Sequence, residues 1–133
     1  MKNLTTKVLA ITVLVIAFQS SFAQSKVKWT APSSASSVKN PLAGNTSILK
    51  DAKVLYQSTC APCHGEKGKG NGPAAASLNP KPADHSSAAV QGQTDGELFW
   101  KMSEGRNPMP AYKAILKDEQ RWMLVNYLRT LKK

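Results

Sequence analysis

The sequence predicts an all-α domain with about three main helices joined by long loops. Three segments space their apolar residues for one face of a helix, and typical helix-start or helix-stop residues flank them. No segment shows the alternation of apolar and polar residues that marks a half-buried strand. The chain has 133 residues, which is enough for one small domain.

The first predicted helix begins near residues 45–47, whose Asn, Thr and Ser side chains are candidate caps. It runs up to Cys60. Its apolar face consists of Ile48, Ala52, Leu55, Tyr56 and Thr59.

The second predicted helix starts at Thr94, which forms a capping-box pattern with Glu97, and Gly105 is placed to end it. Its inner face carries Leu98, Phe99 and Met102. The third predicted helix runs from about Asp118 to Leu131. Its apolar stripe is formed by Leu124, Tyr127, Leu128 and Leu131.

Residues 1–23 are typical of a secretory signal peptide. Lys2 and Lys7 precede an apolar run, and small residues before position 24 suit cleavage after Ala23. A membrane span needs roughly 20 apolar residues, about twice the length of this run. No cysteine follows the run closely, so no lipid anchor is expected. We therefore expect export to the periplasm or medium without a permanent membrane anchor.

Residues 24–46 are rich in Ser, Pro, Ala and Asn, which predicts an irregular N-terminal extension or linker. Trp29 and Leu42 are its apolar exceptions. Such residues either dock on the neighbouring domain or stay exposed in solvent. Residues 47–133 remain as the folded domain.

The motif Cys60-Ala61-Pro62-Cys63-His64 is the attachment pattern of a c-type haem. Two thiols three positions apart can each add to one vinyl group on an edge of the porphyrin, and His64 can then bind the iron. A structural zinc site needs four ligands, and the chain has no second cysteine pair. A thioredoxin-like site should follow a strand, whereas the residues before Cys60 are predicted helical. We therefore expect one covalent haem c with its iron.

The loop at residues 65–93 is long for a small domain. Wrapping a flat cofactor explains its length. Its glycines allow tight turns beside the haem plane. These are Gly65, Gly68, Gly70 and Gly72.

The second iron ligand is predicted to be Met109. Pro108 and Pro110 keep this segment out of helix, so a loop can present the thioether to a metal. Met102 and Met123 fall within helical apolar patterns and are better explained by core packing. His85, or an open iron site, remains an alternative.

From about Ser47 onward the chain resembles a small exported monohaem class I cytochrome c. The resemblance covers roughly two-thirds of the chain, in the order of the family's landmarks. The matching segments are residues 60–65, 67–73, 109–112 and 124–129. The resemblance implies the cytochrome c fold, with its first and last helices crossing and long loops wrapped round one covalent haem.

The same resemblance implies the roles of individual residues. Cys60 and Cys63 would hold the haem as thioethers, with His64 and Met109 as axial iron ligands. At the helix crossing it implies Ala52 and Tyr56 on the first helix and Tyr127 on the last. It also implies that a proline carbonyl accepts a hydrogen bond from the haem histidine, and either Pro80 or Pro82 can serve.

These features predict a one-electron carrier whose haem iron cycles between Fe(III) and Fe(II), and not an enzyme. The alternatives are a peroxidase-type haem enzyme subunit and a gas-binding haem sensor.

The formal net charge is +10, and removal of Lys2 and Lys7 with the signal peptide lowers it to +8. We expect redox partner proteins with an acidic patch, such as a membrane oxidase or a periplasmic reductase. Export and the lack of a basic–aromatic pattern disfavour nucleic acid.

The lysines near the haem motif could ring the exposed haem edge or could simply form a solvated surface that confers solubility. Lys132 and Lys133 are expected at the far end of the last helix. The candidate ring consists of Lys67, Lys69, Lys81, Lys101 and Lys113.

Overall fold

The computed structural model describes residues 28–133, so the predicted signal peptide at residues 1–23 lies outside the described part of the chain. Within residues 28–133 the regular elements are all helical, which confirms the predicted all-α class. None of these helices is long and apolar enough to cross a membrane. In chain order the elements are α2 (Ser33–Ser36), α3 (Leu49–Thr59), α4 (Ala61–His64), η1 (Ala75–Ser77), α5 (Ala88–Gln91), α6 (Asp95–Glu104), η2 (Tyr112–Ala114) and α7 (Asp118–Thr130).

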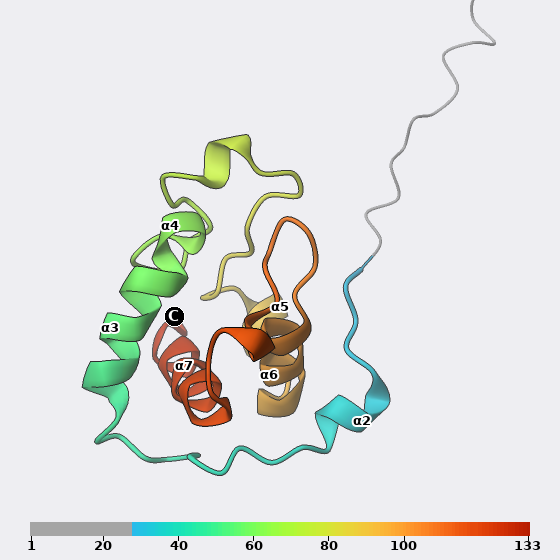
Figure 1. The fold of residues 1–133 in the computed structure, drawn as a ribbon, viewed down its shortest axis with the longest axis vertical. Coiled ribbons are helices and arrows are strands. Elements are labelled where there is room, and N and C mark those ends of the chain that lie inside the picture. Colours follow the sequence, from blue (N-terminus) through green and yellow to red (C-terminus); the bar gives the residue numbers. More distant parts are fainter. Residues whose placement is uncertain (1–27) are drawn as a thin grey trace, which may run out of the picture.

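Helices α3 and α7 pack against each other, with α3 along one side of the fold (Figure 1). Ala52 and Tyr56 of α3 are fully buried. The Tyr127 ring of α7 lies on the Tyr56 ring, with centroids 4.9 Å apart and planes inclined at 49°. The predicted crossing residues are therefore confirmed. Leu124 and Val125 of α7 are also fully buried in this cluster, and burial of each such side chain contributes about 1.5–3 kcal/mol.

Helix α3 begins slightly later than its candidate caps suggest. Its N-cap position is Ile48, without a side-chain cap. The Asn45 side chain instead accepts hydrogen bonds from the backbone N–H and the hydroxyl of Ser47, at 3.1 and 2.7 Å. These bonds form a turn that leads into the helix, so the polar cluster does not cap α3 directly.

Helix α6 has the predicted ends. The Thr94 hydroxyl accepts from the Glu97 N–H at 3.2 Å, and the Glu97 carboxylate accepts from the Thr94 N–H at 2.7 Å. Gly105 ends the helix at φ +64°. Leu98 is buried, and the Phe99 ring stacks on Trp122 of α7 at 3.9 Å between centroids. The predicted inner face of this helix is thus confirmed.

A buried arginine joins α6 to α7. Arg121 of α7 is only 5% exposed. Its guanidinium donates to the Ser103 hydroxyl and to the Asp118 carboxylate, and it lies 4.6 Å from the centroid of the Phe99 ring. Because a buried charge is costly without partners, these contacts offset part of the cost of burying the guanidinium between α6 and α7.

The described part of the N-terminal extension docks on the domain. Its one regular element, the short helix α2, lies beside α6 (Figure 1). A Cβ atom added at Gly96 of α6 would lie 2.0 Å from the Ala35 carbonyl oxygen, so the two backbones are in direct contact. Ala35 itself is buried. Between the two alternatives for this segment, the structure therefore supports docking.

Polar and aromatic contacts extend this docked surface. The Asn40 side chain donates to the Asp95 carboxylate at 2.8 Å and to the Asn126 side chain at 2.7 Å. The Trp29 ring lies 5.5 Å from the Lys101 amine and 5.1 Å from the Arg106 guanidinium carbon. Cations at these distances are attracted to the face of an indole ring. Trp29 is thus one of the contacts that hold the extension on the domain.

Candidate haem-binding site

The cysteine–histidine motif occupies one helical turn. Cys60 ends α3, where its N–H donates to the Tyr56 carbonyl at 2.8 Å, and it also begins α4. The His64 N–H donates to the Cys60 carbonyl at 2.9 Å. In a helical turn, residues three apart lie on the same face, so Cys60 and Cys63 present their thiols on one side. Both thiols are free and half-buried, as the addition of one planar group to the pair requires.

The Cys60 thiol is neutral in this arrangement. Burial, with a smaller effect from nearby Cys63, raises the pKa of the Cys60 thiol to about 12. Once thioethers form, these sulfur atoms no longer titrate.

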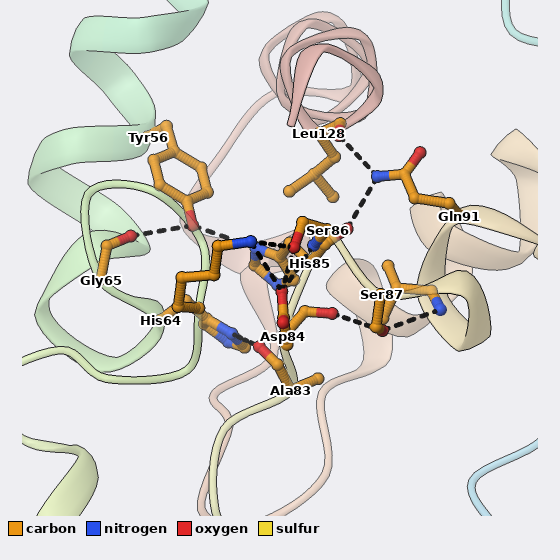
Figure 2. A network of polar contacts seen from close by, with 12 residues as sticks. Tyr56, His64, Gly65, Ala83, Asp84, His85, Ser86, Ser87, Gln91 and Leu128 are labelled. Atoms are coloured by element: carbon orange, nitrogen blue, oxygen red, sulfur yellow. Dashed lines mark hydrogen bonds and ion pairs between the residues drawn. The ribbon is translucent and has the colours of Figure 1, made fainter. Parts of the chain in front are cut away.

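The His64 imidazole is oriented by a backbone carbonyl. Its Nδ1 lies 2.9 Å from the Ala83 oxygen (Figure 2). A carbonyl only accepts, so Nδ1 carries the proton and Nε2 keeps its lone pair for a metal. Burial lowers the pKa of His64, and this hydrogen bond partly offsets the shift.

The expectation that Pro80 or Pro82 supplies the carbonyl is wrong. The Pro82 carbonyl faces Gly70 instead, since a Cβ atom added at Gly70 would lie only 2.4 Å from the Pro82 oxygen. The next carbonyl along the chain, that of Ala83, is the one directed at His64.

The glycine loop, residues 67–73, folds back on the motif. The Gly70 N–H donates to the His64 carbonyl at 2.8 Å, and the Gly72 N–H donates to the Cys63 carbonyl at 3.0 Å. Gly68 has φ +69°, and a Cβ atom there would lie 2.8 Å from Leu131 and 3.0 Å from the Cβ of His85. Only glycine can adopt this positive φ angle and also leave room for the side chains that approach so closely.

His85 does not lie opposite His64. The two imidazoles are stacked, with centroids 4.0 Å apart and planes inclined at 20° (Figure 2). Two face-to-face rings on the same side cannot bind one iron from opposite faces. Burial, with a smaller effect from nearby His64, lowers the pKa of His85 to about 3, so this imidazole is neutral near pH 7.

The Met109 segment is a loop, as the flanking prolines predict. Arg106 and Met109 exchange two backbone hydrogen bonds, of 3.0 and 2.8 Å, which close a tight turn. Met109 is half-buried against the core. By contrast, Met102 lies buried within α6, and Met123 packs on the same core from α7.

A tyrosine hydroxyl connects this loop to the cysteine motif. Tyr112 Oη donates to the Thr59 carbonyl at 3.2 Å, at the end of α3 and next to Cys60. Burial, with smaller effects from nearby Cys60 and Cys63, raises the pKa of Tyr112 to about 12. The Met109 loop is thus anchored beside the two cysteines.

The donor set fits a c-type haem. Two thiols lie on one face of a turn, an imidazole has its Nε2 free, and a loop anchored beside the cysteines carries a thioether. Soft sulfur and imidazole donors suit haem iron.

The comparisons with known proteins agree with this fit. The family described as Cytochrome c matches residues 49–132. The chain belongs to the cytochrome c family. Its cofactor is therefore a covalently attached haem c with iron, the group with which members of this family transfer electrons. The predicted family and fold are confirmed.

A solved structure shows the same fold in a larger chain. It is titled Kuenenia stuttgartiensis reducing HAO-like protein complex Kustc0457/Kustc0458, and the matched chain is 28% identical with a TM-score of 0.63. The match covers 72% of this chain and 50% of that one. The cytochrome c chain described here thus spans about half the length of the solved chain it matches.

Two lysines from distant parts of the chain, Lys69 and Lys133, lie close together. Lys69 contacts the Ser86 hydroxyl and lies 4.0 Å from the Asp84 carboxylate. Hydrogen bonds from Ser86, with smaller effects from nearby Lys69 and Lys133, lower the pKa of Asp84. The expectation that Lys133 lies far from Lys69 is therefore wrong. Lys113 is paired with Glu104 at 2.8 Å.

Three positions at the site have roles that the sequence did not predict. Ala83 acts through its backbone, which no side-chain pattern reveals. Tyr112 belongs to the family motif, but its contact with Thr59 depends on the path of the loop. His85 was considered only as an iron ligand, and its stacking on His64 arises where the loop returns to the motif.

Proposed function

We propose that this cytochrome c is an exported one-electron carrier whose haem iron is bound by His64 and Met109. The observation that carries the proposal is the anchoring of both donors beside the cysteine turn. The Ala83 carbonyl orients His64, and the Tyr112 hydroxyl ties the Met109 loop to Thr59. The iron supplies a one-electron Fe(III)/Fe(II) couple.

The protein's contribution to such a couple is to keep the donors in place. His64 lies on a helical turn whose carbonyls are bonded by the glycine loop. Met109 lies in a closed turn anchored at Thr59 through Tyr112. Donors held in this way move little between the two oxidation states, which favours fast electron transfer. A thioether ligand also raises the reduction potential.

A peroxidase-type subunit or a gas sensor would need an accessible iron position. The experiment that separates these functions uses carbon monoxide. We expect the reduced holoprotein not to bind carbon monoxide, and the ferric protein to show the far-red charge-transfer band of a sulfur–iron bond. Rapid binding of carbon monoxide by the freshly reduced protein would instead favour the sensor or the enzyme.

Export and partners belong to the same proposal. Residues 1–23 have the features of a signal peptide, and thioether attachment of this kind takes place outside the cytoplasm. We place the mature protein in the periplasm or medium. The solved relative belongs to a protein complex, which supports a role for protein partners here as well. A basic carrier suits an acidic docking patch on a membrane oxidase or periplasmic reductase.

A further inference from the structure

The second histidine of the chain covers one face of the first. The His85 and His64 rings lie 4.0 Å apart at 20°, close enough for direct contact (Figure 2). His85 is not part of the cysteine–histidine motif, and the opposed ligand position does not use it. Its neutral, half-buried ring therefore needs a different explanation.

A tyrosine hydroxyl fixes the orientation of the His85 ring. Tyr56 Oη lies 3.0 Å from His85 Nδ1 and 3.2 Å from the Gly65 carbonyl oxygen (Figure 2). The carbonyl can only accept, so the tyrosine proton points to Gly65 and His85 Nδ1–H donates to the tyrosine oxygen. The Tyr56 ring is itself fully buried between α3 and α7. The imidazole is thus fastened to the most rigid part of the fold.

The backbone of His85 is fastened as well. Its N–H donates to the Gly68 carbonyl at 2.6 Å. Its carbonyl accepts from the Gln91 side chain at 2.7 Å, and the same amide nitrogen donates to the Leu128 carbonyl of α7 at 2.8 Å. The glycine loop, α5 and α7 together determine where His85 sits.

We propose that His85 is a positioning residue that sets the plane of the His64 imidazole. This inference rests on the proposed function, in which His64 binds the iron. The hydrogen bond from His64 Nδ1 to the Ala83 carbonyl acts in the plane of the His64 ring. The stacked His85 ring acts perpendicular to that plane and blocks the His64 ring from tilting towards it. Together these two restraints fix the orientation of the His64 ring about the iron–nitrogen bond.

The orientation of an axial imidazole determines how unpaired spin spreads over a ferric haem. The haem methyl resonances in the proton NMR spectrum report that spread directly, whereas a general loss of stability does not change it. The spectrum therefore separates positioning from mere packing.

The test compares His85→Phe with His85→Leu in the full holoprotein. Phenylalanine keeps an aromatic face against His64 and should retain the parental order of ferric haem methyl shifts. Leucine keeps an apolar side chain without a ring and should change the order or the spread of these shifts. Val90→Ala is the control, because Val90 is a buried core residue with no ring contact to His64. It should lower stability while the parental pattern remains.

A parental methyl pattern in His85→Leu would overturn the inference. If that variant yields no holoprotein, Tyr56→Phe is the second test, since it releases Nδ1 of His85 while both rings remain. A smaller change of the methyl pattern is expected there, and an unchanged pattern would also overturn the inference. Failure of the proposed function would look different, because the parent itself would then lack the shifted ring protons of an iron-bound histidine.

Discussion

Gly96→Ala tests whether the N-terminal extension is an integral part of this cytochrome. Gly96 is in the first turn of α6, and an added Cβ atom would lie 2.0 Å from the Ala35 oxygen and 2.8 Å from the Val38 oxygen. Nonbonded heavy atoms prefer about 3.5 Å, so the extension must withdraw by about 1.5 Å. Such overpacking typically costs about 1–3 kcal/mol.

The same substitution should change the free energy of unfolding in the opposite direction when the extension is absent. Gly96 has an ordinary helical backbone, so alanine is favoured there by up to about 1 kcal/mol. We therefore expect Gly96→Ala to destabilise the mature chain and to stabilise a variant that begins at residue 47. Each variant is compared with its own Gly96 parent.

The assay is chemical denaturation of the holoproteins, followed by far-UV circular dichroism, with the midpoint and slope recorded for all four proteins. Ser34→Ala is a matched control on α2, since Ser34 is exposed and should not alter docking. Destabilisation of equal size in both backgrounds would refute the reasoning, because the clash could then not involve the extension. Stabilisation of the full mature chain would refute it as well.

Three further predictions concern attachment, the α6–α7 interface and partners. Acid denaturation and solvent extraction should leave the haem on the polypeptide, and Cys63→Ala should give at best a singly attached product. Ser103→Ala removes a partner of the buried Arg121 and should lower the free energy of unfolding by about 1–3 kcal/mol, measured by denaturation; Ser36→Ala, at an exposed site, should not. Electron transfer with an acidic partner should slow as the Debye length falls from about 30 Å at 0.01 M salt to about 10 Å at 0.1 M, and rates indifferent to salt would contradict steering.

Features specified by neighbouring residues could be predicted from the sequence. Thr94, Glu97 and Gly105 mark the ends of α6 because capping depends on side chains within one turn of the helix end. The cysteine–histidine motif is equally local, and its spacing indicated the cofactor. The crossing residues Ala52 and Tyr56 came from the resemblance, and the structure buries both.

Features that depend on where a loop returns could not be predicted. Every residue has a carbonyl, so the sequence could not single out Ala83 over Pro82; the tight approach of Pro82 to Gly70 decides between them. Helix α2 consists of weak helix-forming residues and has no side-chain cap, so its sequence does not predict a helix. It forms where the extension packs beside α6. Lys69 and Lys133 are distant in sequence and meet near Asp84 in the fold.

The ligation of iron by Met109 is the most direct test of the proposed carrier. A methionine bound to ferrous haem iron shows its methyl protons far upfield in the NMR spectrum, because the haem ring current shifts them. We expect such a signal in the reduced protein, its loss in Met109→Ala, and its survival in Met102→Ala and Met123→Ala, whose side chains pack in the core. Absence of the signal from the parent, or its survival in Met109→Ala, would contradict the proposed axial pair.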